Sequence, residues 1–275
     1  MLLRSIQTQC SILFNRKSVM LTYFVLQCAV IANFFMNIRE NVRMQYVTEM
    51  HNPIKVLALS DWSVTSYYIL SFLPILIAIP TALTYLPDKD SRIQVYMEGR
   101  CGSAAYWYGK VIAVFLVTLF VFTVPFLTEL IMCGICYSPV SNNDPSNSTY
   151  VRMIGDEGGF FLAEFFFKNR YAYAVLCILL FGIVMGILGV FNFAVSTLPF
   201  MKFRIFAFFP VYVLLYGIDI VTKAVEPEYT TYYLFILRMF DFQPKNYMVY
   251  CCFLIFLLGV SLVIVLQNTR KDNLL

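Results

Sequence analysis

Charged residues are scarce in this chain. Only 13% of its 275 residues are charged, 60% are hydrophobic, and the mean hydropathy is +0.73. A soluble domain carries about a quarter charged residues because its surface must be solvated. The composition therefore excludes a soluble globular domain. The formal net charge of +4 is spread along the chain, so no nucleic-acid partner is indicated.

Histidine is nearly absent, which limits the chemistry that the chain can perform. His51 is the single histidine, whereas most intramembrane metalloproteases and Ser/His dyads depend on histidine side chains. Cys133 and Cys136 form a CxxC pair without the further ligands that a metal site needs. We expect no catalytic residue, metal or cofactor in this chain, and we interpret its cysteines as structural.

A nucleotide-binding loop is absent as well. Gly109 and Lys110 follow the wrong spacing for a GxxxxGK[ST] motif and precede Val111. The chain therefore cannot hydrolyse ATP through such a loop. An energy source, if one is needed, must come from another subunit or from an ion gradient.

Long stretches without a charge define six candidate membrane spans. They lie between Lys17 and Arg39, Asp61 and Asp88, Lys110 and Glu129, Arg170 and Lys202, Arg204 and Asp219, and Lys245 and Arg270. A helix of about 18 to 20 apolar residues crosses the hydrocarbon core. The sequence therefore predicts an all-α integral membrane protein with six transmembrane helices. The fifth stretch has only 14 residues, and it crosses only if Asp219 lies inside the membrane or faces protein.

The placement of lysine and arginine predicts the orientation. Eleven cations fall within 57 residues in the segments 1–17, 87–110, 198–204 and 267–275. Nine cations fall within 86 residues in the segments 36–61, 135–170 and 223–246. Because cytoplasmic segments carry an excess of Lys and Arg, we expect a multi-pass protein of the cytoplasmic membrane with both termini in the cytoplasm.

The first 17 residues favour an interfacial helix rather than a cleaved signal peptide. One helical face carries the apolar residues Leu2, Leu3, Ile6, Cys10 and Leu13, and the opposite face carries Arg4, Gln7, Gln9 and Ser11. Such a helix lies in the membrane surface and leads into the first span. The alternative is a frayed N-terminus. Farther along, Gly182, Gly186 and Gly189 predict close helix packing by the fourth span.

The inner segment 87–110 is the most informative part of the sequence. It holds seven charged residues, and Ile93, Val95, Tyr96 and Met97 interrupt them. A solvated loop with stop-transfer cations is one interpretation. The interleaved apolar residues and the closing run Tyr-Trp-Tyr-Gly-Lys at 106–110 favour a structured segment instead.

On these features the chain resembles the type-2 ABC exporter permease family. Members have an N-terminal interfacial helix, six spans, and an acidic-then-Arg inner loop that ends in Tyr-x-x-Gly-Lys at the third span. The matching residues are Asp90, Glu98, Arg100, Tyr106, Gly109 and Lys110, and the layout matches over nearly the full length. Ser91 and Arg92 stand where many members have glycine and threonine.

The resemblance implies a single transmembrane permease domain, 1–275, and specific partners. The loop 87–110 would be a coupling helix on a separate nucleotide-binding ATPase subunit, which would bind ATP and Mg²⁺. The residues that would couple to this subunit are Asp90, Arg92, Glu98, Arg100, Tyr106 and Lys110. A second permease chain, identical or homologous, would pair with this one in the bilayer. The outer segment 223–246 would re-enter the membrane as short helices, for which 229–242 is apolar enough; a surface segment is the alternative.

Two carboxylates within the predicted spans, Glu129 and Asp219, could line a translocation path. Intramembrane carboxylates usually face protein or water, and an interfacial anchor or an interhelical hydrogen bond is the alternative that we favour for Glu129. We expect an exporter subunit for a hydrophobic or amphipathic substrate, such as a peptide, an antimicrobial or a lipophilic compound. A non-transporting membrane protein, such as an immunity or assembly subunit, is the alternative. A secondary transporter ranks third because the spans hold few charges.

Overall fold

The computed structural model describes most of the chain in ten helical segments. The described residues are 2–42, 46, 51–61, 63–82, 84–137, 161–198, 206, 208–225, 238–240 and 247–272. The helices among them are α1 (Leu2–Phe14), α2 (Lys17–Asn41), α3 (Val64–Ala82), α4 (Leu86–Asp90), α5 (Ile93–Cys101), α6 (Ser103–Cys136), α8 (Ala163–Lys168), α9 (Arg170–Ser196), α10 (Phe209–Val225) and α12 (Tyr247–Asp272). These residues contain no β-strand; one isolated bridge joins Ser60 and Met239.

Five of these helices are long and apolar enough to cross a membrane, namely α2, α3, α6, α9 and α12. Their apolar parts have 18 to 34 residues, or about 27 to 51 Å at 1.5 Å per residue. This confirms an all-α, multi-pass membrane protein. The fifth expected helix exists as α10, but it has 17 residues and its apolar part is only Phe209–Ile218. It is shorter than a full span because Asp219 and Lys223 end the apolar run.

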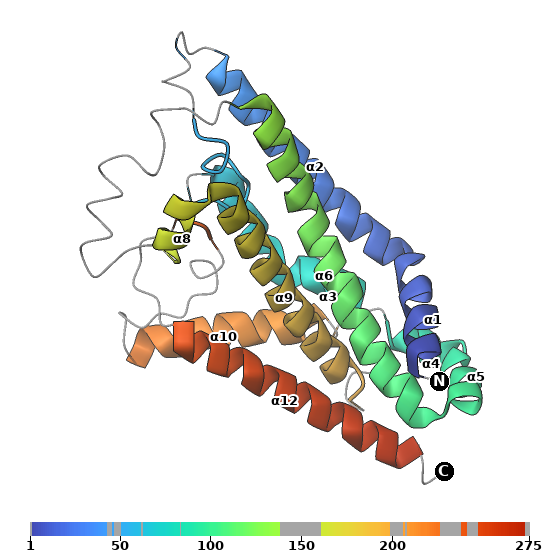
Figure 1. The fold of residues 1–275 in the computed structure, drawn as a ribbon. Helices are drawn as coiled ribbons and strands as arrows, with labels where there is room; N and C mark the ends of the chain where they lie inside the picture. The colour runs from blue at the N-terminus through green and yellow to red at the C-terminus, as the bar shows by residue number, and fades with distance from the viewer. Residues whose placement is uncertain are drawn as a thin grey trace.

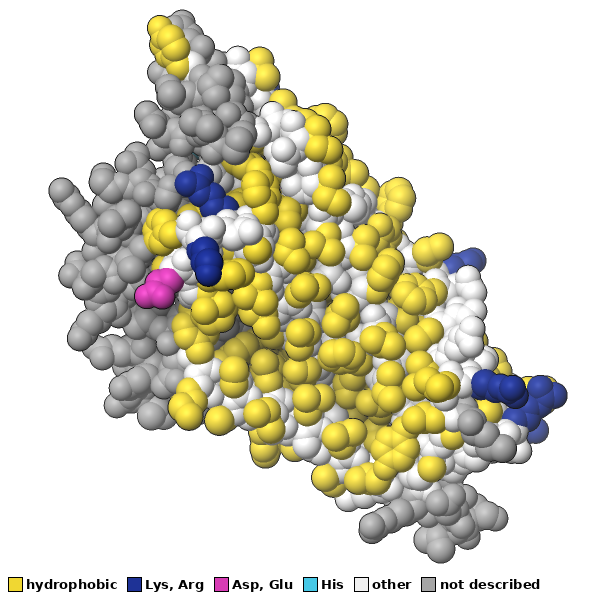
Figure 2. All heavy atoms as spheres, in the orientation of Figure 1, with side chains coloured by type: hydrophobic (Ala, Val, Ile, Leu, Met, Phe, Trp, Pro, Cys, Tyr) yellow, Lys and Arg dark blue, Asp and Glu magenta, His cyan; other side chains and the backbone are white. Residues whose placement is uncertain are grey.

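Charge and apolar surface are segregated along the bundle. Figure 2 shows a broad hydrophobic face, with basic side chains gathered at two ends. Large apolar side chains are exposed on the outer helices, for example Phe24 on α2 and Ile255 and Phe256 on α12. A water-soluble surface would not expose a continuous apolar face of this kind. The face therefore has the properties of a surface in contact with lipid chains.

Helix α1 begins and helix α12 ends at the same end of the bundle. Figure 1 places the beginning of α1, the short helices α4 and α5 and the C-terminal end of α12 together. We call this the terminal end. We call the opposite end, where α9 and α12 begin and α8 lies, the distal end. The long helix α6 packs against α1, α2 and α9 and so connects the two ends.

The three glycines of α9 lie where this helix packs closely on its neighbours. A Cβ atom on Gly182 would come within 2.5 Å of Thr123 Cγ2, and one on Gly186 within 2.7 Å of the Phe115 ring. At Gly189 the nearest atom is Thr118 Oγ1 at 3.0 Å. The packing role predicted from their spacing is confirmed, because small residues let helix backbones approach in lipid.

Gly186→Ala is expected to destabilise the protein by about 1–3 kcal/mol, because the added methyl group overpacks the contact with Phe115. The matched control is Gly259→Ala in α12, where a Cβ meets nothing within 4 Å. That change removes a helical glycine and is expected to be neutral or stabilising by up to about 1 kcal/mol. Thermal unfolding of both variants in one detergent measures the difference, and equal shifts would contradict the close contact.

The predicted N-terminal helix is present as α1, and its apolar residues are divided between the packed side and the exposed side. Ser5, Gln9 and Leu13 are buried, whereas Leu2 and Leu3 are exposed. Ser5 Oγ donates a hydrogen bond of 2.8 Å to the carbonyl of Ala105 in α6. Gln9, assigned to the polar face, is therefore turned inward, because α6 offers it a polar partner. The exposed leucines remain on the outside of the helix.

Candidate functional site

The segment between α3 and α6 folds into two short helices with sharp breaks between them. Arg92 adopts a left-handed conformation with φ of 56° and separates α4 from α5. Gly102, with φ of 82°, separates α5 from α6 and donates its N–H to the Glu98 carbonyl at 2.8 Å. Glycine adopts this conformation without steric cost. The segment is thus a structured turn and not a plain linker.

Helix α5 presents a mixed apolar and basic surface at the terminal end. It has no buried residue, and Ile93, Val95 and Tyr96 are among the exposed large apolar side chains. The Arg100 guanidinium lies over the Tyr96 ring, 4.4 Å from its centroid. Arg92 is also exposed. A surface of aromatic, aliphatic and arginine side chains has the composition of a protein-binding patch.

The coupling residues predicted from the sequence fall into two groups. Asp90, Arg92 and Arg100 are exposed and lie on or beside α5. Glu98 is half-buried on α5 and accepts a hydrogen bond of 2.9 Å from Gln94. Tyr106 and Lys110 lie instead inside the bundle on α6, with exposed fractions of 1% and 0%. The first group, on or beside α5, consists of Asp90, Arg92, Glu98 and Arg100. Only this group lies at the surface, where another subunit can contact it directly.

Lys110 belongs to a buried ionic cluster. Its Nζ pairs with one oxygen of Asp88 and donates to Gln9 Oε1 at 3.1 Å. The other oxygen of Asp88 accepts from Arg16. Asp88 comes from α4, Arg16 from the junction of α1 and α2, and Lys110 from α6. One carboxylate therefore ties three separate elements together at the terminal end.

The geometry of this cluster determines how α4 and α5 can move. Asp88 is 2% exposed, so its hydrogen bonds with the two cations are shielded from water and strong. If α4 moves away from α1 and α6, these bonds must break. If the bonds stay intact, α1 and α6 must move together with α4. Sequence reasoning missed Asp88, Arg16 and Gln9 as a group. The available signal was that Arg16, Asp88 and Lys110 each border a span at the same membrane edge.

At the distal end, Glu129 is at the centre of a second buried polar cluster. Its Oε1 accepts hydrogen bonds from Asn33 Nδ2 at 2.7 Å and from the Ala58 N–H at 3.0 Å. Its Oε2 lies 3.0 Å from the same N–H. Glu129 is 0% exposed. These bonds connect α6 with α2 and with segment 51–61, which is the interhelical arrangement that we favoured.

Segment 51–61 is part of the packed bundle and not an external loop. Ile54, Leu57, Ala58 and Leu59 are at most 1% exposed. Asn33 Nδ2 also donates to the Val56 carbonyl at 2.8 Å. The distribution of Lys and Arg places 36–61 on the outer side and does not reveal this burial. The short apolar run from Val56 to Leu59 was the available signal.

The other predicted features lie largely outside the described residues. Asp219 lies within α10, but its side chain is not described. Of the segment 223–246, only 223–225 and 238–240 are described. Residues 238–240 contact segment 51–61, since the Met239 N–H donates to the Leu59 carbonyl and the Asp61 N–H donates to the Met239 carbonyl, both at 2.9 Å. All eight cysteines are described and all are free thiols.

Comparison with protein families, curated proteins and solved structures found no match to this chain.

Proposed function

We propose that this chain is the transmembrane permease subunit of an ATP-driven exporter in the cytoplasmic membrane. In this proposal α10 completes a sixth crossing and the terminal end faces the cytoplasm. ATP and Mg²⁺ bind a separate nucleotide-binding subunit, and a second permease chain completes the path. The substrate is hydrophobic or amphipathic, and Asp219 is the remaining candidate for a carboxylate on the path.

The observation that carries this proposal is the exposed surface of α4 and α5 above the buried cluster of Asp88. A partner that drives transport must both bind the membrane protein and move it. Val95, Tyr96 and Arg100 supply an exposed apolar and basic surface for binding. The bonds of Asp88 to Arg16 and Lys110 supply a stiff connection from this surface to α1 and α6. A plain stop-transfer loop needs neither feature.

Photo-crosslinking from α5 tests the proposal. A photoreactive amino acid at Val95, which is 68% exposed, is expected to capture a protein that carries a GxxxxGK[ST] loop. The control position is Ile255 on α12, which is 69% exposed on the apolar face and is expected to capture no such protein. Mass spectrometry of the crosslinked species gives the answer. Capture of proteins without a nucleotide-binding loop at Val95 would favour an immunity or assembly subunit instead.

The orientation is tested by labelling single cysteines from outside intact cells, in a chain whose eight native cysteines are replaced by serine. Gly99 on α5 accepts a Cβ with nothing within 4 Å, and Glu164 on α8 is exposed. With the terminal end in the cytoplasm, Glu164→Cys reacts with a membrane-impermeant maleimide and Gly99→Cys reacts only after the cells are opened. The reverse pattern would overturn the orientation and with it the proposed docking of an ATPase.

A further inference from the structure

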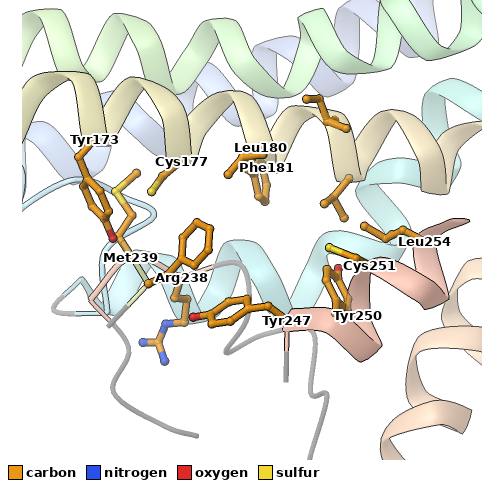
Figure 3. A pocket seen from close by; sticks show the side chains of 13 residues that line it. Tyr173, Cys177, Leu180, Phe181, Arg238, Met239, Tyr247, Tyr250, Cys251 and Leu254 are labelled. Atoms are coloured by element: carbon orange, nitrogen blue, oxygen red, sulfur yellow. The ribbon is translucent and has the colours of Figure 1, made fainter. Parts of the chain in front are cut away.

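A cavity of about 300 Å³ lies between α9 and α12 in the distal half of the bundle. Residues 173–184 of α9 and 247–254 of α12 supply most of its lining, and Met239 and Arg238 lie at one end of it (Figure 3). Almost every lining side chain is apolar or aromatic. Among the described residues of the lining, Arg238 alone is charged.

Water is a poor occupant for the apolar part of this cavity, away from Arg238 and the tyrosine hydroxyls. A buried water needs two to four polar partners, and the walls formed by Leu180, Phe181, Val184 and Leu254 offer none. Both helices cross the membrane and expose apolar side chains beside the cavity. Hydrocarbon chains therefore surround the site and match its lining. A methylene group, like a water molecule, takes up about 30 Å³. The cavity therefore holds on the order of ten methylene groups.

Arg238 gives the occupant a polar end. Its Nε donates to Ser66 Oγ at 3.0 Å, its Nη2 donates to the Asp61 carbonyl at 3.2 Å, and its Nη1 pairs with Asp61 Oδ1 at 2.6 Å. A guanidinium has five N–H donors, so one on each terminal nitrogen remains after these bonds. Two such donors suit the phosphate or ester oxygens of a lipid.

We propose that this cavity binds one acyl chain of a membrane phospholipid, with the oxygens of its head group at Arg238. The site is separate from α4, α5 and their proposed partner, and it does not depend on the transport function. Because the Asp61 carboxylate already balances the charge of Arg238, the site has little preference for the charge of the head group. Its selectivity comes mainly from the fit of the acyl chain to the apolar lining. Phosphatidylcholine and phosphatidylglycerol should therefore bind about equally.

A phospholipid with a diazirine at the end of one acyl chain tests this site. The full chain is placed in lipid nanodiscs containing a small fraction of this lipid, irradiated, and mapped by mass spectrometry. Adducts are expected to concentrate on the buried cavity residues Phe181 and Val184. Fewer are expected on Ile255 and Phe256, which are 69% and 66% exposed on α12. Adducts spread evenly over the apolar face would mean ordinary lipid contact and would overturn the proposal.

Two pairs of neighbouring residues provide matched variants. Leu254→Trp fills the cavity and should lower adducts on residues 177–184 of α9 about tenfold, the effect of excluding about two methylene groups. Ile255→Trp adds the same ring to the outer surface and should leave them unchanged. If Leu254→Trp does not fold, Cys251→Phe in the lining and Cys252→Phe beside it decide the question in the same way. Equal adduct maps within a pair would contradict a specific site.

Discussion

Asp88→Ala is expected to lower the stability of the protein by about 3–5 kcal/mol, the cost of breaking a buried ion pair by removing one partner. The change leaves Lys110, which is 0% exposed, without its carboxylate. Arg16 loses the same partner, but its side chain is 17% exposed and can turn toward water. Most of the penalty therefore comes from the desolvated ammonium group of Lys110.

The control for this prediction lies two residues away. Asp90→Ala removes the same charge from an exposed position, where an ion pair contributes at most about 1 kcal/mol. Thermal unfolding of the two variants in one detergent separates the buried from the exposed carboxylate. Similar shifts for Asp88→Ala and Asp90→Ala would mean that the cluster does not hold the terminal end together.

A double variant identifies the source of the penalty. Asp88→Ala combined with Lys110→Met removes the unpaired charge and replaces it with an apolar side chain of similar length. Buried ion pairs are often replaced by apolar residues at little cost. We therefore expect the double variant to be more stable than Asp88→Ala alone. A purely additive loss would instead assign the effect to the packing of α4.

The spans could be predicted from the sequence because lipid imposes a strict rule on charge. A helix in hydrocarbon satisfies its own backbone and must exclude unpaired charges, so stretches without charge marked α2, α3, α6, α9 and α12. The same rule explains why Asp219 made the fifth span uncertain, and α10 is indeed short. The spacing of Gly182, Gly186 and Gly189 predicted that α9 packs closely on a neighbouring helix, because only small residues let two helix backbones approach each other.

The full sets of partners in the two polar clusters could not be assigned from the sequence, because each cluster is made by contacts between residues distant in the sequence. Lys110 was assigned to the cytoplasmic segment 87–110 and, from the resemblance, to the coupling residues. In the structure it lies inside the bundle, where it bonds to Asp88 and Gln9. Glu129 was recognised as unusual, whereas its partner, the Ala58 N–H, is a backbone group that no sequence pattern reveals. A local sequence pattern indicates that burying a charged or polar residue is costly. It does not identify the residue whose hydrogen bond offsets this cost.

Glu129→Ala is expected to destabilise the distal end by about 2–4 kcal/mol. The change leaves the Ala58 N–H without its acceptor and removes one of the acceptors of Asn33, and each unsatisfied buried group costs about 1–3 kcal/mol. Glu129→Gln keeps an oxygen where Oε1 accepts from both donors, but it places an NH2 group where Oε2 accepts from the Ala58 N–H. Its effect should therefore be smaller than that of Glu129→Ala without being zero. If Glu129 only lined a translocation path, the losses of stability in Glu129→Ala and Glu129→Gln would not differ in this way.

Glu129→Ala should also release segment 51–61, and this can be measured directly. Leu59 is 1% exposed, so a cysteine at this position reacts slowly with a maleimide while the segment stays packed. Because the bond from the Ala58 N–H to Glu129 holds this segment against α6, Glu129→Ala should increase the labelling of Leu59→Cys, and Glu129→Gln should increase it little. Unchanged labelling and unfolding temperature in Glu129→Ala would show that other contacts, such as that of Asn33 with Val56, hold the segment. A change in transport by itself, with segment and stability intact, would instead return Glu129 to the translocation path.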